Sequence, residues 1–177
     1  LQAETIEIAA DEVVTTDLFI TAGVATISGK VEGDLFIIAN EVRISGEIGG
    51  STYLLARTTQ VSGTMQGTVR WAGDSISLLE NASLARDLFA LGNSVSTEPQ
   101  TQITGSLNVA ARSLDLQGDV VQEARLAGDD VKLVGRFESD VSLAIASVSG
   151  LTGTDSETGL TIGENTNFGG DLMIQTE

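Results

Sequence analysis

A long internal repeat runs through almost the whole chain and constrains its fold more than any other feature of the sequence. The stretch DLFITAGVATISGKVEG at 17–33 is followed directly by DLFIIANEVRISGEIGG at 34–50. Equivalent starting residues are Asp17, Asp34, Ser51, Thr68, Asp87, Ser106, Glu123, Asp140 and Asp171. A fixed period of this length predicts a solenoid, in which each repeat packs only on its neighbours.

The spacing between these starts is 17 in most copies, with two intervals of 19 and a last one of 31. The stretch SISLLENASLARDLFA at 75–90 aligns without a gap on GLTIGENTNFGGDLMI at 159–174, so the last interval is a copy of the longer repeat with an insertion. We therefore predict a single domain over 1–177, with a partial first repeat at 5–16, an insertion at 149–159 and a final strand at 171–175.

Apolar residues recur at fixed positions of the repeat and define its sides. In the second copy, Leu35 and Ile37 are two residues apart, which is the alternation of a β-strand. A second pair, Val42 and Ile44, follows at the same spacing, and a lone apolar residue, Ile48, completes the repeat. Each repeat therefore has three sides that face a core.

Small and turn-forming residues stand between the sides. The column after the first side reads Gly23, Asn40, Arg57, Asp74, Asn93, Arg112 and Asp129. Gly, Asn and Asp tolerate left-handed backbone angles, so we expect a corner of that kind here. A glycine column marks the next corner with Gly29, Gly46, Gly63, Gly118 and Gly135.

These patterns predict an all-β, single-domain parallel β-helix with three sides and about nine turns of about 17–19 residues. A β-sandwich is less compatible, because its returning antiparallel strands would not keep the columns in register at this period. Left-handed β-helices keep a strict hexapeptide pattern, with three hexapeptides in each turn. This chain has neither the hexapeptide pattern nor a turn built of three hexapeptides, so the prediction is a right-handed helix.

Composition excludes several classes of function. The chain has 25 acidic and 9 basic residues and a formal charge of −16, which would repel nucleic acid. It has no histidine and no cysteine, and so lacks the commonest general base and the usual zinc ligands. The expectation is a protein that is not an enzyme and has no cofactor or metal site.

The first residue of the repeat forms an acidic column, which includes Asp17, Asp34, Asp87, Glu123, Asp140 and Asp171. Stacked carboxylates repel one another, so a cation or a hydrogen-bond donor must offset them. The functional interpretation is a calcium ladder or an acid–base pair. We favour the structural one, in which each carboxylate accepts a local backbone amide at a corner.

Apolar side chains also occupy positions that should face solvent on the first side. They are Phe19, Phe36, Ile38, Tyr53, Leu55, Phe89 and Leu91. An exposed apolar patch of this size is seldom tolerated without a use, which predicts a lateral interface. The alternative is that these residues only stiffen the ladder or lie under a terminal tail.

The repeat GDLFIIANEVRISGEIGG at 33–50 resembles the rung of the bactofilin-type, polymer-forming β-helical family of bacterial proteins. This resemblance covers roughly residues 5–175. It implies a right-handed, three-sided β-helix without a cofactor that serves as a self-associating scaffold at the bacterial cell envelope. The longer repeats and the insertion depart from the family pattern.

Partners and location follow as expectations from the same resemblance. We expect self-association, lateral or end-to-end, or binding to an envelope protein, with membrane association through segments outside this chain. The start at LQAET suits a processed export signal, so an extracytoplasmic location is favoured over a cytoplasmic, membrane-associated one. The alternative function is an extracytoplasmic module that binds glycan or cell-wall polymer on the aromatic column.

Overall fold

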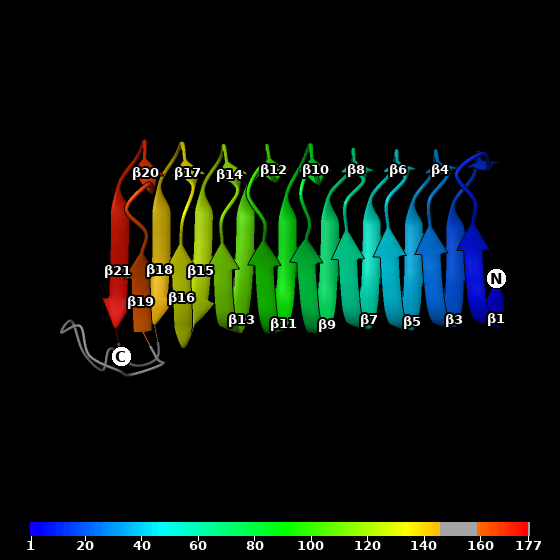
Figure 1. Cartoon of the computed structure of the whole chain (residues 1–177), viewed down its shortest axis with the longest axis horizontal. Helices are drawn as coiled ribbons and strands as arrows, with labels where there is room; N and C mark the ends of the chain where they lie inside the picture. Colours follow the sequence, from blue (N-terminus) through cyan, green and yellow to red (C-terminus); the bar gives the residue numbers. More distant parts are fainter. Residues whose placement is uncertain (146–158, 177) are drawn as a thin grey trace.

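The computed structural model describes residues 1–145 and 159–176, and all their regular secondary structure is β-strand. The strands coil into a straight rod with β1 at one end and β21 at the other (Figure 1). The predicted insertion at 149–159 falls, except for Gly159, outside the described residues.

Two parallel sheets run along the rod. The larger sheet has 12 strands. They are β1 (Gln2–Ile8), β3 (Leu18–Ile27), β5 (Leu35–Ile44), β7 (Thr52–Val61), β9 (Val69–Leu78), β11 (Leu88–Thr97), β13 (Leu107–Leu116), β15 (Ala124–Gly128), β16 (Asp130–Leu133), β18 (Val141–Ile145), β19 (Gly159–Ile162) and β21 (Leu172–Thr176).

The smaller sheet has nine strands of two residues each. They are β2 (Val13–Val14), β4 (Lys30–Val31), β6 (Glu47–Ile48), β8 (Thr64–Met65), β10 (Ser83–Leu84), β12 (Gln102–Ile103), β14 (Asp119–Val120), β17 (Arg136–Phe137) and β20 (Asn167–Phe168).

Every pairing joins a strand to its counterpart one turn away, in parallel and in the register of the repeat. Leu18 pairs with Leu35, and Leu35 pairs with Thr52. The starting strand of the repeat occurs nine times, from β3 to β21, so the rod has eight complete turns with a partial turn at each end. The predicted parallel β-helix is confirmed.

Each long strand bends once and covers two sides of the turn. In β5, Leu35 and Ile37 face inward, and then Val42 and Ile44 do, so the alternation inverts between the two pairs. The register with β3 omits Asn40, at the bend. We call the first half side one and the second half side two, and the smaller sheet is side three.

The corner between sides one and two does not use the left-handed backbone that the sequence predicted. Among the described residues other than glycine, only Asn81 and Gln100 have positive φ, of 66° and 69°. Both lie between sides two and three, in the longer turns. There the two extra residues form a β-turn, in which the Ala82 amide donates to the Leu79 carbonyl over 3.0 Å.

The shorter turns make the same corner with stacked glycines. A Cβ atom on Gly46 would lie 1.8 Å from the carbonyl oxygen of Gly29 in the preceding turn. No side chain fits this spacing, so glycine is required by close approach of the backbones. The predicted glycine corner is therefore confirmed.

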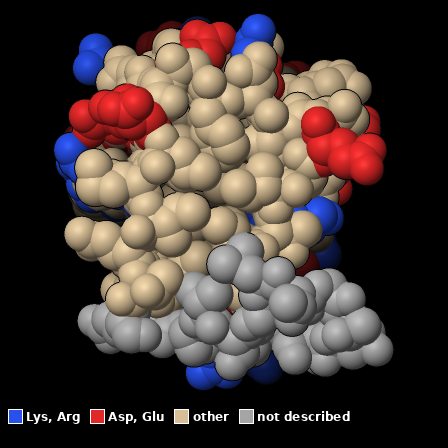
Figure 2. All heavy atoms as spheres, turned by 90° about the vertical axis from the view of Figure 1, so that its left-hand side faces the viewer, with Lys and Arg blue, Asp and Glu red and all other residues tan. Residues whose placement is uncertain are grey.

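The interior of the rod is filled by apolar side chains from all three sides. Ile27, Ile44 and Leu78 are among the fully buried ones. At the β21 end, charged side chains lie around the rim and uncharged ones fill the centre (Figure 2). Ile162 and Ile174 occupy inward columns in this last turn and are 44% and 43% exposed, because no further described turn covers them.

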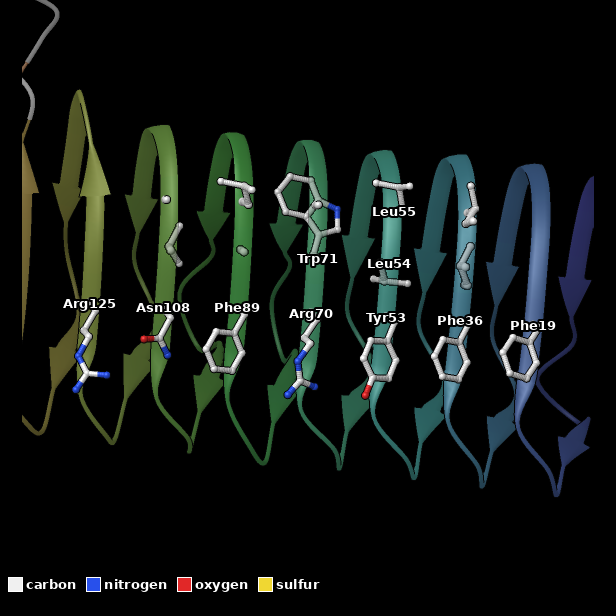
Figure 3. A pocket seen from close by; sticks show the side chains of 17 residues that line it. Phe19, Phe36, Tyr53, Leu54, Leu55, Arg70, Trp71, Phe89, Asn108 and Arg125 are labelled. Atoms are coloured by element: carbon white, nitrogen blue, oxygen red, sulfur yellow. The ribbon is translucent and has the colours of Figure 1, made fainter.

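The helix is right-handed. In Figure 3 the N-terminal turns lie on the right, side one runs upward in front, and the chain bends over and runs downward behind. A chain that advances to the left along this path makes a right-handed coil, as predicted.

One turn accommodates a tryptophan in the core. Trp71 is 3% exposed, and its indole Nε1 donates to Thr59 Oγ1 over 3.0 Å. A Cβ atom on Gly92 would lie 2.5 Å from Trp71 Cη2 and 2.6 Å from the Gly73 carbonyl oxygen. One on Gly73 would lie 2.8 Å from Cζ2 and 1.7 Å from the Ala56 carbonyl oxygen. The two glycines of this corner therefore make the space that the ring fills.

We predict that Gly92→Ala lowers the free energy of unfolding by about 1–3 kcal/mol, because it overpacks the tryptophan site. In a Trp71→Leu/Thr59→Val background, the same substitution should cost less, since the ring is gone and only the contact with the Gly73 carbonyl oxygen, at 2.6 Å, remains. Urea denaturation of the four chains measures both effects. Equal costs in the two backgrounds would contradict this account of the corner.

Candidate functional site: the outer strip of side one

Two columns of side chains project outward from side one, and together we call them the outer strip. The aromatic column is the third position of the repeat and the aliphatic column is the fifth. The aromatic column contains Phe19, Phe36, Tyr53, Arg70, Phe89, Asn108, Arg125, Ser142 and Met173. The aliphatic column contains Thr21, Ile38, Leu55, Ala72, Leu91, Ala110, Ala127, Ala144 and Gln175.

The structure brings all seven predicted interface residues onto this one face. Ile38, Leu55 and Leu91 are 56%, 55% and 62% exposed. Phe19 and Phe89 are also exposed, while Phe36 and Tyr53 are half-buried by their neighbours in the column. The strip is thus an uncovered apolar surface on the described part of the chain.

The aromatic rings form a regular stack along the rod (Figure 3). The ring centroids of Phe19 and Phe36 are 4.5 Å apart, and those of Phe36 and Tyr53 are 4.6 Å apart. The rings are parallel within 3° and 2°. The parallel register imposes this geometry, because it places each ring one strand spacing from the next.

Arg70 continues the stack where the column has no ring. Its guanidinium carbon lies 5.4 Å from the Tyr53 centroid on one side and 5.5 Å from the Phe89 centroid on the other. Both distances suit cation–π attraction. No role for this arginine was predicted from the sequence. Its position in the column is the signal that could have identified its role.

A shallow groove runs along the rod between the two columns. Its volume is about 990 Å³, and it extends from Phe19 to Arg125. Six strand spacings of about 4.8 Å make this distance roughly 29 Å. The aromatic column forms one wall and the aliphatic column the other, so an elongated apolar partner could lie along it.

The rings are inclined to the rod axis. Figure 3 shows the faces of Phe19, Phe36 and Tyr53 turned partly toward the viewer, so each ring exposes part of its face as well as its edge. An apolar partner or a sugar ring could therefore contact this column.

The charge of the strip differs from that of the whole chain. Neither column contains Asp or Glu, although the net charge is −16. Its only charged residues are Arg70 and Arg125, and Arg125 is paired with Glu123 at 2.5 Å. The acidic side chains lie on other columns, so apolar contact on the strip does not bury a carboxylate.

The acidic column has a structural role in the described turns. One carboxylate oxygen of Asp17 accepts the backbone amide of Asp34 over 2.9 Å, and Asp34 accepts the amide of Ser51 over 2.7 Å. Asp87 and Asp140 make the same contact with the following turn. We expected a local amide, but the donor lies one turn away, because the corner places Asp directly beneath it.

A glycine, Gly50, precedes the donor Ser51 and packs against the same Asp34 carboxylate. A Cβ atom on Gly50 would lie 2.4 Å from Asp34 Oδ1. The same contact is made by Gly33, Gly105 and Gly170, which explains why glycine recurs before the residue whose amide binds the carboxylate. Within the described residues, no group of three or more acidic, histidine or cysteine side chains is arranged to hold a metal ion.

Known proteins add no further information about the strip. Comparison with protein-family models, with curated proteins and with solved structures finds no match to this chain.

We predict that Asp34→Ala lowers the free energy of unfolding by about 1–2 kcal/mol, because it removes the acceptor for the Ser51 amide. Asp34→Asn keeps an acceptor oxygen and should lose less. Addition of calcium should leave the melting temperature of the unaltered protein unchanged. A calcium-dependent rise that Asp34→Asn abolishes would contradict the structural role and support a cation ladder.

Proposed function

We propose that this protein is a non-enzymatic scaffold, a rigid rod that self-associates by placing its outer strip against the strip of a second copy. The observation that carries the proposal is the exposure of Ile38, Leu55, Leu91 and the aromatic stack on one face. Monomeric soluble proteins rarely leave a continuous apolar surface of this kind uncovered.

The fold suits a scaffold because it supplies length and stiffness. Parallel ladders join successive turns on all three sides. Within the described residues, every buried side-chain nitrogen or oxygen has a hydrogen-bond partner. A solenoid of this kind presents the same surface at each turn, so contacts on one face add along the rod.

A second copy is the occupant that the strip fits best. Its side chains recur at the same strand spacing of about 4.8 Å, so two strips can remain in step along their whole length. Since the strip itself carries no acidic residue, the repulsion between two chains of charge −16 acts over a longer range and is screened by salt.

The cell envelope is part of this proposal and is supported by the resemblance to bactofilin-type proteins. The described residues contain no helix long and apolar enough to cross a membrane. An envelope protein that binds the strip, or segments outside this chain that reach the membrane, would connect the rod to its location. Fractionation of bacteria that express the full-length protein tests this part.

The proposal predicts a mass above that of the 18.4 kDa monomer in sedimentation equilibrium, with association that strengthens from low to physiological salt. Ile38→Glu with Leu55→Glu should return the protein to a monomer, because it places four carboxylates in each two-copy interface.

The matched control is Val13→Glu with Val121→Glu, which adds the same charge at exposed apolar positions of side three. This control should associate like the unaltered protein. A chain that stays monomeric at every concentration and salt, or an equal loss in both double variants, would contradict the proposal.

A further inference from the structure

We infer that the second copy lies antiparallel to the first, with the rods related by a two-fold axis through the middle strand, β11. This inference rests on the proposed self-association through the outer strip and specifies its geometry. It follows from the unequal distribution of large and small side chains along the strip.

The strip has a bulky half and a flat half. We number the side-one strands as turns 1 to 9, from β3 to β21, so that β11 is turn 5. In the aliphatic column, turns 2 and 3 hold Ile38 and Leu55, whereas turns 7 and 8 hold Ala127 and Ala144. In the aromatic column, turn 2 holds Phe36 and turn 8 holds Ser142.

A two-fold axis parallel to the strands reverses one rod and places turn n of one copy against turn 10 − n of the other. Each column then faces the same column. Ile38 faces Ala144, Leu55 faces Ala127 and Phe36 faces Ser142. At turns 2, 3, 7 and 8, large side chains of each copy thus meet small ones of the other, which evens the separation of the two faces there. At turns 1 and 9, Phe19 faces Met173 and forms an apolar contact at each end.

The polar members of the aromatic column are also matched by this arrangement. Tyr53 of turn 3 faces Arg125 of turn 7, whose guanidinium is paired with Glu123 of its own copy and can also donate to the Tyr53 hydroxyl. Arg70 of turn 4 faces the Asn108 amide of turn 6, whose oxygen can accept from the guanidinium. At the axis, Phe89 and Leu91 meet their own copies and form an apolar centre.

The parallel arrangement packs less well. A two-fold axis along the rod would place each turn against the same turn, so bulky halves would meet at one end and flat halves at the other. The bulky end would hold the two faces apart and leave the flat end without contact. A gap of this kind forfeits dispersion along about half of the strip.

The area needed for a stable dimer also favours overlap along the full length. The nine side-one strands, β3 to β21, span eight spacings or roughly 38 Å, and five residues of side one span about 17 Å, which gives a flat footprint of about 650 Å². A typical interface covers about 800 Å² of each partner's accessible surface, and corrugated side chains bring this footprint close to that value. The bulky half alone, from turn 1 to turn 5, covers only about half the footprint.

Spin-label distances distinguish the arrangements, and the absence of native cysteine makes single labels straightforward. Asn40→Cys, Arg57→Cys and Asn93→Cys place labels at turns 2, 3 and 5, on exposed corner residues beside the strip. In the antiparallel dimer, the two labels of a pair are offset along the rod by roughly 29, 19 and 0 Å. Double electron–electron resonance should therefore give the shortest distance at Asn93→Cys and the longest at Asn40→Cys.

Other outcomes overturn the inference in recognisable ways. Equal distances at all three positions would show parallel rods, and a minimum at Arg57→Cys would show overlap of the bulky halves alone. Either result would leave self-association through the strip standing. A labelled chain that sediments only as a monomer would overturn the proposed function as well.

A size exchange provides an independent test. Ala127→Leu should weaken the dimer roughly tenfold, because it meets Leu55 of the other copy. Adding Leu55→Ala to the same chain should restore the affinity, since the two sizes are exchanged. Ala85→Leu, at an exposed position of side three, is the control and should change nothing. An unchanged affinity in Ala127→Leu would overturn the antiparallel geometry.

Discussion

Parallel, in-register pairing between successive turns is the interaction on which the rest of this structure depends. It places each residue directly beside its counterpart one repeat away, so a repeat in sequence becomes a column in space. The core, the glycine corner, the carboxylate contacts and the aromatic stack are all columns of this kind. Each contact is modest by itself, and repetition along the rod makes the assembly stiff.

The same register also decides which side chains lie together on each outer face of the rod. The groove on side one lies along a face of the rod, and such a face has the chemistry of its columns. On side one these columns are aromatic and aliphatic, and they lack carboxylates in a chain of charge −16. That separation of apolar and acidic surface is what makes contact between copies physically reasonable.

Much of this structure could be predicted from periodicity alone. The inward columns, the three sides and the residues of the outer strip follow from alternation at fixed spacing. Contacts that depend on how closely residues of neighbouring turns approach one another could not be predicted in this way. The first corner bends without positive φ, Asp34 binds an amide one turn away, Gly92 makes space for Trp71, and Arg70 lies between two rings. Composition and spacing do not specify backbone angles or side-chain rotamers, which decide these contacts.

Solvent accessibility of methyl groups in solution tests the central claim most directly. A soluble paramagnetic probe broadens the NMR signals of exposed methyl groups, and its effect can be followed as protein concentration rises. This account predicts that Ile38, Leu55, Leu91, Ala127 and Ala144 become protected together, while Val13 and Val121 on side three remain accessible. Unchanged accessibility of the strip over the whole concentration range would contradict it.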